Sequence, residues 1–207
     1  MMRCYRLILP DLTTTCRVSL LLAFAVLGAA PCLFGAPPAS AFEYRVLATS
    51  KTSTMEKELN EAADAGYRFD AVMGGETAIG GAEVVAVMSR HPDAKARFSY
   101  KLLATSKTST MEKELQEAAE AGFEYRDQTV FKSLFGGTEV ICILEREADA
   151  GARRSQYKLL ATTKTSTLQK ELQEAGAAGY QLRGMTVAKT AMGGKELVAI
   201  LRREGDR

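Results

Sequence analysis

The fold of this chain is decided by one stretch of 24 residues, YRVLATSKTSTMEKELNEAADAGY, which runs from Tyr44 to Tyr67. The stretch returns at 100–123, where 19 of the 24 residues are unchanged, and again without gaps at 157–180. The period is 56 and then 57 residues. Similarity at a fixed period predicts that one structural unit is repeated three times along the chain.

Each copy begins with the pattern of a strand followed by a helix. Residues 44–49 are short, β-branched and partly alternating, which is typical of a strand. From 52 to 65, apolar residues recur at helical spacing and form one stripe opposite charged residues. A serine and a glutamate or glutamine three residues apart have the spacing of a capping box, so we expect helix N-caps at Ser53, Ser109 and Ser166. A glycine that ends a helix in the left-handed conformation is expected at Gly66, Gly122 and Gly179.

The second half of each copy has the pattern of a hairpin. A second strand begins at Tyr67, and a glycine pair that favours a tight turn follows at Gly80-Gly81, Gly136-Gly137 and Gly193-Gly194. The third strand, 84–88 in the first copy and 197–201 in the last, is a continuous apolar run. Such a run indicates burial on both faces, or an interface on one.

The sequence therefore predicts an α+β fold of three tandem βαββ repeats at 42–91, 99–147 and 156–204. The third strands should be buried, together with the helix residues Met55, Leu59, Met111, Leu115, Leu168 and Leu172. A unit of about 48 residues buries too little surface to be stable alone, and neither disulfides nor a metal compensate here. We expect the three units to pack together, either as an extended sheet or closed around a pseudo-threefold axis.

The first 41 residues have the pattern of a cleavable secretory signal. Arg3, Arg6 and Arg17 precede an apolar run over 18–36, and Ala39-Ser40-Ala41 supplies small residues for cleavage after Ala41. The predicted location is therefore periplasmic or extracellular. An uncleaved anchor is the alternative, because 19 apolar residues are long enough to span a bilayer. A lipoprotein at Cys32 is disfavoured, because Pro31 stands where a small residue is needed.

The remainder of the chain has a globular composition and no net charge. The whole sequence is 46% hydrophobic and 25% charged, which excludes collagen-like and broadly disordered classes. Removal of residues 1–41 leaves 24 basic and 24 acidic residues, so nothing favours nucleic acid as a partner. Only Cys142 remains of the four cysteines, which excludes an internal disulfide and four-cysteine metal spacing. Its place in an apolar run indicates a small core residue.

The unit resembles the small bacterial domain-of-unknown-function family four-one-seven-seven. The resemblance lies in ELNEAADAGY at 58–67 and EVVAVMSR at 83–90, and it extends over nearly all of 43–203. The tryptophan of the family pattern is replaced by Tyr67, Phe123 and Tyr180, and its first helical glycine survives only as Gly176. The resemblance implies a βαββ fold. It carries no established activity and no catalytic residues.

The candidate binding residues lie in a Lys-Thr-Ser-Thr segment that is identical in all three copies. It falls between strand and helix, where free N–H groups and the helix dipole suit phosphate, sulfate or carboxylate. The alternative is a capped helix with a solvated lysine, because the glycines of a P-loop are missing. The candidate ligand-binding residues are Lys51, Thr52, Ser53, Lys107, Thr108, Ser109, Lys164, Thr165 and Ser166.

Two sets of repeated carboxylates could carry other chemistry. If the units closed around a threefold axis, Glu83, Glu139 and Glu196 could converge on a cation, although pairing with Arg90, Arg146 or Arg203 is the favoured interpretation. The pairs Glu58/Glu61, Glu114/Glu117 and Glu171/Glu174 would serve acid–base catalysis only in a cleft, and a solvated helix face is favoured. His91, the single histidine, lies in a linker, which disfavours nucleophilic catalysis.

The function that the sequence favours is that of an exported, non-catalytic interaction module. It would bind a partner protein or an envelope component and need no cofactor or metal, and it would not span the membrane once the signal is cleaved. One alternative is a binder of small anions at the three Lys-Thr-Ser-Thr segments. Another is an envelope enzyme that uses carboxylates between the repeats. Self-association through exposed strand edges is a further possibility for the partner.

Overall fold

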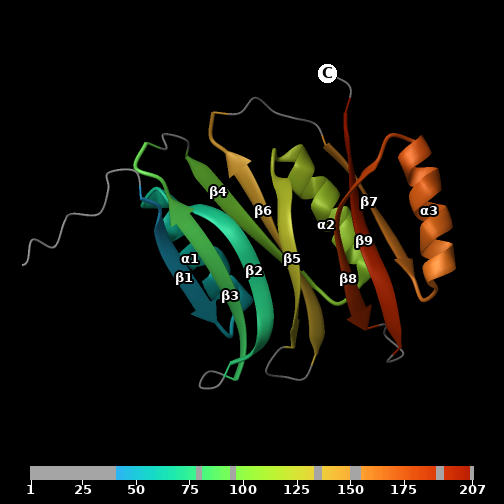
Figure 1. Cartoon of the computed structure of the whole chain (residues 1–207), viewed down its shortest axis with the longest axis horizontal. Helices are drawn as coiled ribbons and strands as arrows, with labels where there is room; N and C mark the ends of the chain where they lie inside the picture. Colours follow the sequence, from blue (N-terminus) through green and yellow to red (C-terminus); the bar gives the residue numbers. More distant parts are fainter. Residues whose placement is uncertain are drawn as a thin grey trace, which may run out of the picture. The chain divides into compact units, whose positions relative to one another are not determined.

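The structure, a computed structural model, describes residues 41–77, 81–93, 97–132, 137–149, 155–189 and 194–205 (Figure 1). Apart from Ala41, the predicted signal segment lies outside the described residues, as do Gly80, Gly136 and Gly193 of the predicted turns. The described residues all belong to one compact unit. No described helix is long and apolar enough to cross a membrane.

The order strand, helix, strand, strand occurs three times. Unit 1 contains β1 (Glu43–Thr49), α1 (Thr52–Asp64), β2 (Arg68–Thr77) and β3 (Gly81–Arg90). Unit 2 contains β4 (Phe98–Thr105), α2 (Thr108–Glu120), β5 (Glu124–Lys132) and β6 (Thr138–Glu147). Unit 3 contains β7 (Ser155–Thr162), α3 (Thr165–Ala177), β8 (Gln181–Lys189) and β9 (Lys195–Glu204).

Each unit forms its own antiparallel sheet of three strands, with the last strand in the centre. The orders are β1-β3-β2, β4-β6-β5 and β7-β9-β8. The predicted α+β class is therefore confirmed, and the structure shows three small antiparallel sheets. The described strands do not join into the single extended sheet that was one of the two expected arrangements. Each second strand has a bulge near its start, after Phe69, Tyr125 and Leu182.

The helices begin earlier than the capping-box pattern predicts. Their N-caps are Lys51, Lys107 and Lys164, without a side-chain cap hydrogen bond, so the predicted caps at Ser53, Ser109 and Ser166 are wrong. The hydroxyl of the threonine that ends the preceding strand accepts a hydrogen bond from the N-cap amide, as in Lys51 N to Thr49 Oγ1 at 3.2 Å. This short turn fixes the start of the helix and leaves the serine inside the first turn.

The helices end as predicted. Gly66, Gly122 and Gly179 have φ of 86°, 84° and 83°, the left-handed region that favours glycine. In unit 1 the Tyr67 amide donates to Ala62 O at 3.0 Å and the Gly66 amide to Ala63 O at 2.8 Å, the pattern of a Schellman motif. The arginine at the end of the third strand closes each helix end, because its guanidinium donates to the backbone oxygen of Ala65, Ala121 or Ala178.

The hydrophobic cores are shared between consecutive units. The first core combines Met55, Leu59 and Met88 of unit 1 with residues of unit 2, namely Tyr100, Phe131, Ile141 and Ile143. The second core combines unit 2 with Tyr157, Ala188, Val198 and Ile200 of unit 3 in the same way. We call the side of each sheet that carries its own helix the helix face, and the other side the open face. The open face of one unit thus closes the core of the unit before it.

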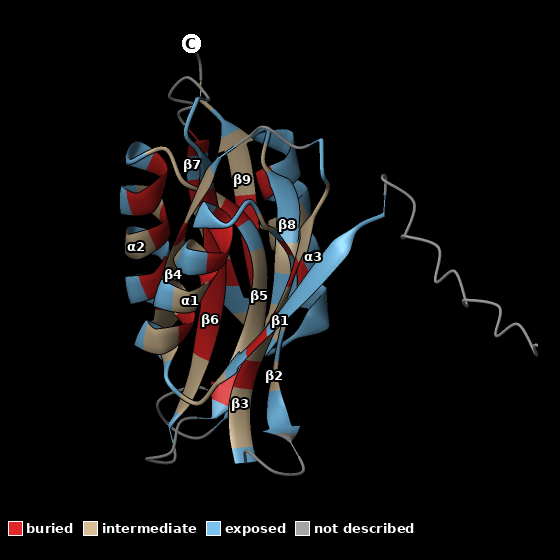
Figure 2. Ribbon diagram, turned by 90° about the vertical axis from the view of Figure 1, so that its left-hand side faces the viewer, coloured by how far each residue is buried: buried red, intermediate tan, exposed pale blue. Residues whose placement is uncertain are grey.

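This arrangement explains which third strands are buried on both faces. In β6 alternate side chains belong to two cores, and 140–145 are all buried (Figure 2). In β3 only Val84, Ala86 and Met88 are buried, because no unit covers the open face of unit 1. The third core contains residues of unit 3 alone, and Leu172 is only partly buried there, unlike the other five predicted helix residues.

Candidate functional site

The most elaborate polar contacts lie where consecutive units meet. We call the contact between units 1 and 2 junction 1, and that between units 2 and 3 junction 2. At junction 1 the side-chain amide of Asn60 pairs with the edge of β4, since Tyr100 N donates to Asn60 Oδ1 and Asn60 Nδ2 donates to Tyr100 O, both at 2.9 Å. Leu102 N donates to Glu56 Oε2 at 2.8 Å. The helix of unit 1 therefore satisfies backbone groups of the edge strand of unit 2.

A tyrosine reaches across each junction to the bulge of the preceding unit. The Tyr100 hydroxyl accepts a hydrogen bond from Phe69 N at 2.8 Å and donates to Glu145 Oε2 at 2.9 Å. At junction 2 the Tyr157 hydroxyl accepts from Tyr125 N at 2.7 Å, and Tyr157 N donates to Gln116 Oε1 at 3.1 Å. Burial raises the pKa of both tyrosines above the ordinary value. Both hydroxyls serve as structural hydrogen-bonding groups across the junctions.

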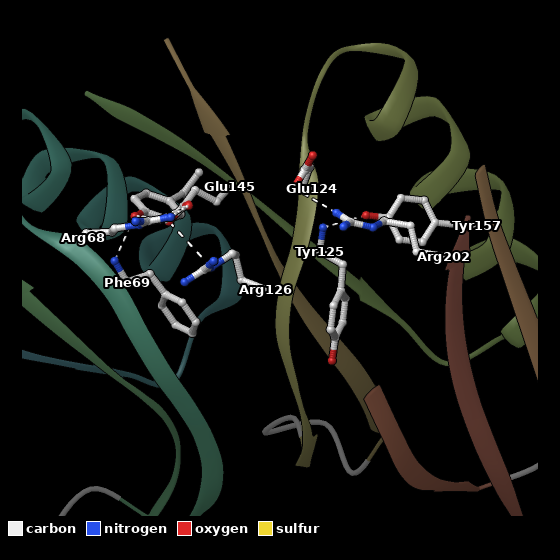
Figure 3. Close-up of polar contacts among 9 residues, drawn as sticks. Arg68, Phe69, Glu124, Tyr125, Arg126, Glu145, Tyr157 and Arg202 are labelled. Carbon is white, nitrogen blue, oxygen red and sulfur yellow. Dashed lines mark hydrogen bonds and ion pairs between the residues drawn. The ribbon is translucent and has the colours of Figure 1, made fainter. Parts of the chain in front are cut away.

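Each junction also contains one short ion pair (Figure 3). Arg68 of unit 1 lies 2.8 Å from Glu145 of unit 2, whose side chain is 6% exposed, and Arg126 lies 3.7 Å from the same carboxylate. The hydrogen bond to Glu145 raises the pKa of Arg68. At junction 2 Glu124 lies 2.8 Å from Arg202. Burial alone would lower the pKa of Arg202, but the hydrogen bond and charge of Glu124 outweigh it and raise that pKa.

The charges of the two pairs are reversed at equivalent positions. Arg68 and Glu124 occupy the same place in units 1 and 2, and Glu145 and Arg202 the same place in units 2 and 3. Sequence analysis missed both pairs, because the partners lie 77 and 78 residues apart and the repeats differ at these positions. The available signal was the reversal itself, which a comparison of the copies for compensating charges would have found.

Unit 1 presents an open face that no other part of the described chain covers. Tyr44 is 68% exposed, whereas its equivalent Tyr100 is 3% exposed. Phe42, Val46 and Met73 are also exposed, and the rings of Phe42 and Tyr44 stack with centroids 6.4 Å apart. At the other end of the stack, unit 3 exposes Leu182, Met185 and Val187 of β8, and both β1 and β8 are largely pale blue in Figure 2. All the large exposed apolar side chains that the structure describes belong to these two ends.

The predicted anion-binding residues remain three separate helix starts. Lys51, Lys107 and Lys164 are exposed, and so are Ser53, Ser109 and Ser166. Each segment belongs to its own unit, and among the described residues the hydrogen bonds at the helix starts stay within one unit, as in Lys51 N to Thr49 Oγ1. The structure does not bring the nine candidate residues together.

The predicted carboxylates do not form a reactive cluster. In each acidic pair the second glutamate forms an i,i+4 ion pair with a lysine of its own helix, as in Lys57–Glu61 at 3.5 Å. Within the described residues no group of three or more His, Cys, Asp or Glu side chains could hold a metal ion. Arg90, a predicted partner of Glu83, pairs instead with Glu43 at 2.6 Å, because the end of β3 lies beside the start of β1.

Among the described residues, neither His91 nor Cys142 forms the nucleophile–base pair that covalent catalysis requires. The His91 ring lies against Phe42 with centroids 5.1 Å apart, and its Nδ1 accepts from the Asp93 amide. Cys142 is completely buried in the second core beside Met111. Burial raises the pKa of the Cys142 thiol to about 12, so the interpretation as a small core residue is confirmed.

No family model, curated protein or solved structure matches the chain. The resemblance to the domain-of-unknown-function family four-one-seven-seven therefore stays a prediction from the quoted motifs. The geometry shows polar contacts at the two junctions and exposed apolar side chains at the uncovered ends in units 1 and 3.

Proposed function

We propose that the protein is an exported, non-catalytic interaction module made of three tandem βαββ repeats. It acts in the periplasm or outside the cell, after cleavage behind Ala41. Its binding surface is the open face of unit 1, where Phe42, just before the edge strand β1, and Tyr44 and Val46 on it present an aromatic and aliphatic patch. It needs neither a metal nor a cofactor.

The observation that carries this proposal is the distribution of exposed apolar side chains. Exposed apolar patches on a soluble protein mark interaction sites, whereas single exposed apolar residues are ordinary. Here the large ones gather at the two ends of the stack and are absent from the exposed sides of the helices. The titratable groups with shifted pKa values lie in cores and junctions or at a helix end.

Photo-crosslinking in intact cells tests the proposal. A photoreactive phenylalanine analogue at position 44 probes the open face, and the same analogue at Lys57, on the exposed side of α1, is the matched control. We expect a crosslinked adduct from position 44 and none from position 57. Equal labelling from both positions, or no adduct from position 44, would overturn the proposal. The mass of the isolated protein gives its first residue, which we expect to be Phe42.

Small-anion binding at Lys51, Lys107 and Lys164 is the second candidate function. The observation that favours it is that all three helix starts lack a side-chain cap hydrogen bond, which leaves backbone amides for an anion. Thermal unfolding in inorganic phosphate or sulfate, matched for ionic strength with chloride, tests it. A stabilisation that is lost in the triple Lys→Ala variant supports the candidate, and the absence of any anion-specific shift excludes it.

A further inference from the structure

The two uncovered ends of the stack carry the two halves of one junction. We propose that the open face of unit 1 in one copy docks on unit 3 of a second copy, with the contacts of junctions 1 and 2. The protein then associates head to tail. This inference rests on the proposed function and names a second copy of the chain as the partner.

The open face of unit 1 has the residues that such a contact requires. Tyr44 stands where Tyr100 and Tyr157 stand in the other units, and Val46 stands where Leu102 and Leu159 stand. In β3 the partly exposed Val85 and Val87 stand in the positions of Ile141 and Ile143, which are completely buried at junction 1. Every one of these positions keeps an apolar or tyrosine side chain although nothing in the described chain covers it.

Unit 3 offers the matching surface. Leu182, which is 50% exposed, is the equivalent of Phe69, which is 1% exposed at junction 1. The third core lacks the residues that a following unit supplies to the first and second cores. Accordingly Leu172 is only partly buried, whereas its equivalents Leu59 and Leu115 are completely buried. An open face of the same kind as those of units 2 and 3 would complete this core.

The polar groups also correspond. Gln173 is exposed on α3 in the position of Asn60 and Gln116, whose side chains bond the backbone of Tyr100 and Tyr157. Tyr44 N, on the edge strand β1, is the equivalent donor for Gln173. The Tyr44 hydroxyl would accept from the Leu182 amide, just as Tyr100 and Tyr157 accept from the amide next to each bulge.

The charges permit this contact. The positions of the ion pair are Gln181 in unit 3 and Ser89 in unit 1, which are both neutral. No like charges therefore meet at this position. Since the contact joins two different surfaces, repetition produces a closed ring or an open filament according to the rotation between copies. Its affinity is expected to be below that of the covalently linked junctions, which benefit from a high effective concentration.

Analytical ultracentrifugation with complementary variants tests the inference on protein expressed from the full chain. Tyr44→Asp blocks the open face of unit 1, and Leu182→Asp blocks the docking surface of unit 3. Both positions are exposed, so each variant should keep the wild-type melting temperature. We expect wild-type mass to rise with concentration. Each variant alone should associate about a hundredfold more weakly, because an uncompensated carboxylate would be buried. Mixed together, the two variants should form a dimer and nothing larger.

A charge pair at Gln181 and Ser89 provides a gain-of-function test with a matched control. Gln181→Arg with Ser89→Glu copies the pair of Arg68 and Glu145, and we expect about tenfold tighter association. Gln181→Arg with Ser89→Arg changes the same positions but opposes like charges, and we expect weaker association than wild type.

Three results would overturn the inference. One is a wild-type protein that stays monomeric at all concentrations, and another is a Leu182→Asp variant that still dimerises through two unit 1 faces. The third is equal affinity for the two charge designs. A crosslink from position 44 to a different protein, with a monomeric wild type, would overturn the inference and leave the proposed function standing. The absence of any crosslink would overturn both.

Discussion

The Tyr100 hydroxyl donates to Glu145 Oε2 at 2.9 Å, and this contact joins a buried tyrosine to a nearly buried carboxylate. Both residues belong to unit 2, but both also contact unit 1 and so stabilise junction 1. Tyr100 also accepts from the Phe69 amide of unit 1, and Glu145 also accepts from Arg68 of unit 1. One pair of side chains thus fixes the position of both the backbone and a charge of the neighbouring unit.

Glu145→Gln should destabilise the protein by about 2 kcal/mol, since it removes the charge of a buried carboxylate and one of the two oxygens that accept from Arg68 and Tyr100. Glu147→Gln, at an exposed carboxylate two residues further on, is the matched control and should change the free energy of unfolding by less than about 0.5 kcal/mol. Urea denaturation measures both. Equal losses in the two variants would show that the contacts of Glu145 stabilise the protein no more than those of an exposed carboxylate.

Exchange of the charges at junction 1 should be tolerated, because junction 2 already has the reversed order. Arg68→Glu alone places two carboxylates together and should cost more than 1 kcal/mol, as an order-of-magnitude estimate. Addition of Glu145→Arg should recover part of that loss, because Arg126 and the Tyr100 hydroxyl also contact Glu145 and lose that partner. The coupling energy from the double-mutant cycle is the measurement. Simple additivity of the two single losses would contradict direct pairing.

Alkaline pH should destabilise the protein through its buried tyrosines. Burial raises the pKa of Tyr100, Tyr125 and Tyr157 above the ordinary value of 10.0. Between the ordinary and the raised pKa the folded state holds protons that the unfolded state has released, so the free energy of unfolding falls as pH rises above about 10. Each tyrosine contributes a slope of about 1.4 kcal/mol per pH unit.

Denaturant titrations at a series of pH values test this dependence. Tyr100→Phe should reduce the slope by one such contribution relative to the wild type. An unchanged slope in this variant would mean that Tyr100 does not contribute to the alkaline loss.

Gln128→Met should stabilise the protein by about 1 kcal/mol. Both polar atoms of the Gln128 amide are buried without a hydrogen-bond partner, and the equivalent residues are Val72 and Met185. The same substitution at Gln116 should have the opposite effect, because Gln116 Oε1 accepts from Tyr157 N. Thermal unfolding distinguishes the two variants, and a loss of stability in both would contradict the expectation.

The same substitution at two glycines of unit 3 should act with opposite signs. Gly176→Ala lies in α3 where nothing meets the added methyl group, and it should stabilise the protein by about 0.5 kcal/mol. Gly179→Ala forces a left-handed alanine against the Arg203 side chain, and it should destabilise by about 1–2 kcal/mol. Calorimetry on both variants is the measurement. Equal changes in the melting temperature of the two variants would argue against a helix end that needs a left-handed residue at Gly179.

The sequence was sufficient for features that repeat and insufficient for features that differ between copies. The helix over 52–65 and its two copies follow from apolar periodicity, and the terminating glycines follow from their position. The helix start was mispredicted, because Thr49 competes with Ser53 for the role of ordering the turn. The junctions could not be predicted from one copy, because Arg68 and Glu145 lie in different copies and form an ion pair only when the units pack together. Leu172 was misjudged for a related reason, as its burial in the other units depends on a following unit.

The reversed ion pairs also bear on how three similar units find their correct neighbours while the chain folds. Tandem repeats of high similarity are prone to misassembly, in which a unit docks on the wrong neighbour. Docking of unit 1 directly on unit 3 would bring Arg68 to Arg202, and docking of unit 2 on the unit 2 of another molecule would bring Glu124 to Glu145. Both mistakes meet like-charge repulsion. The reversal of charge would therefore disfavour a wrong order of the repeats by electrostatic repulsion.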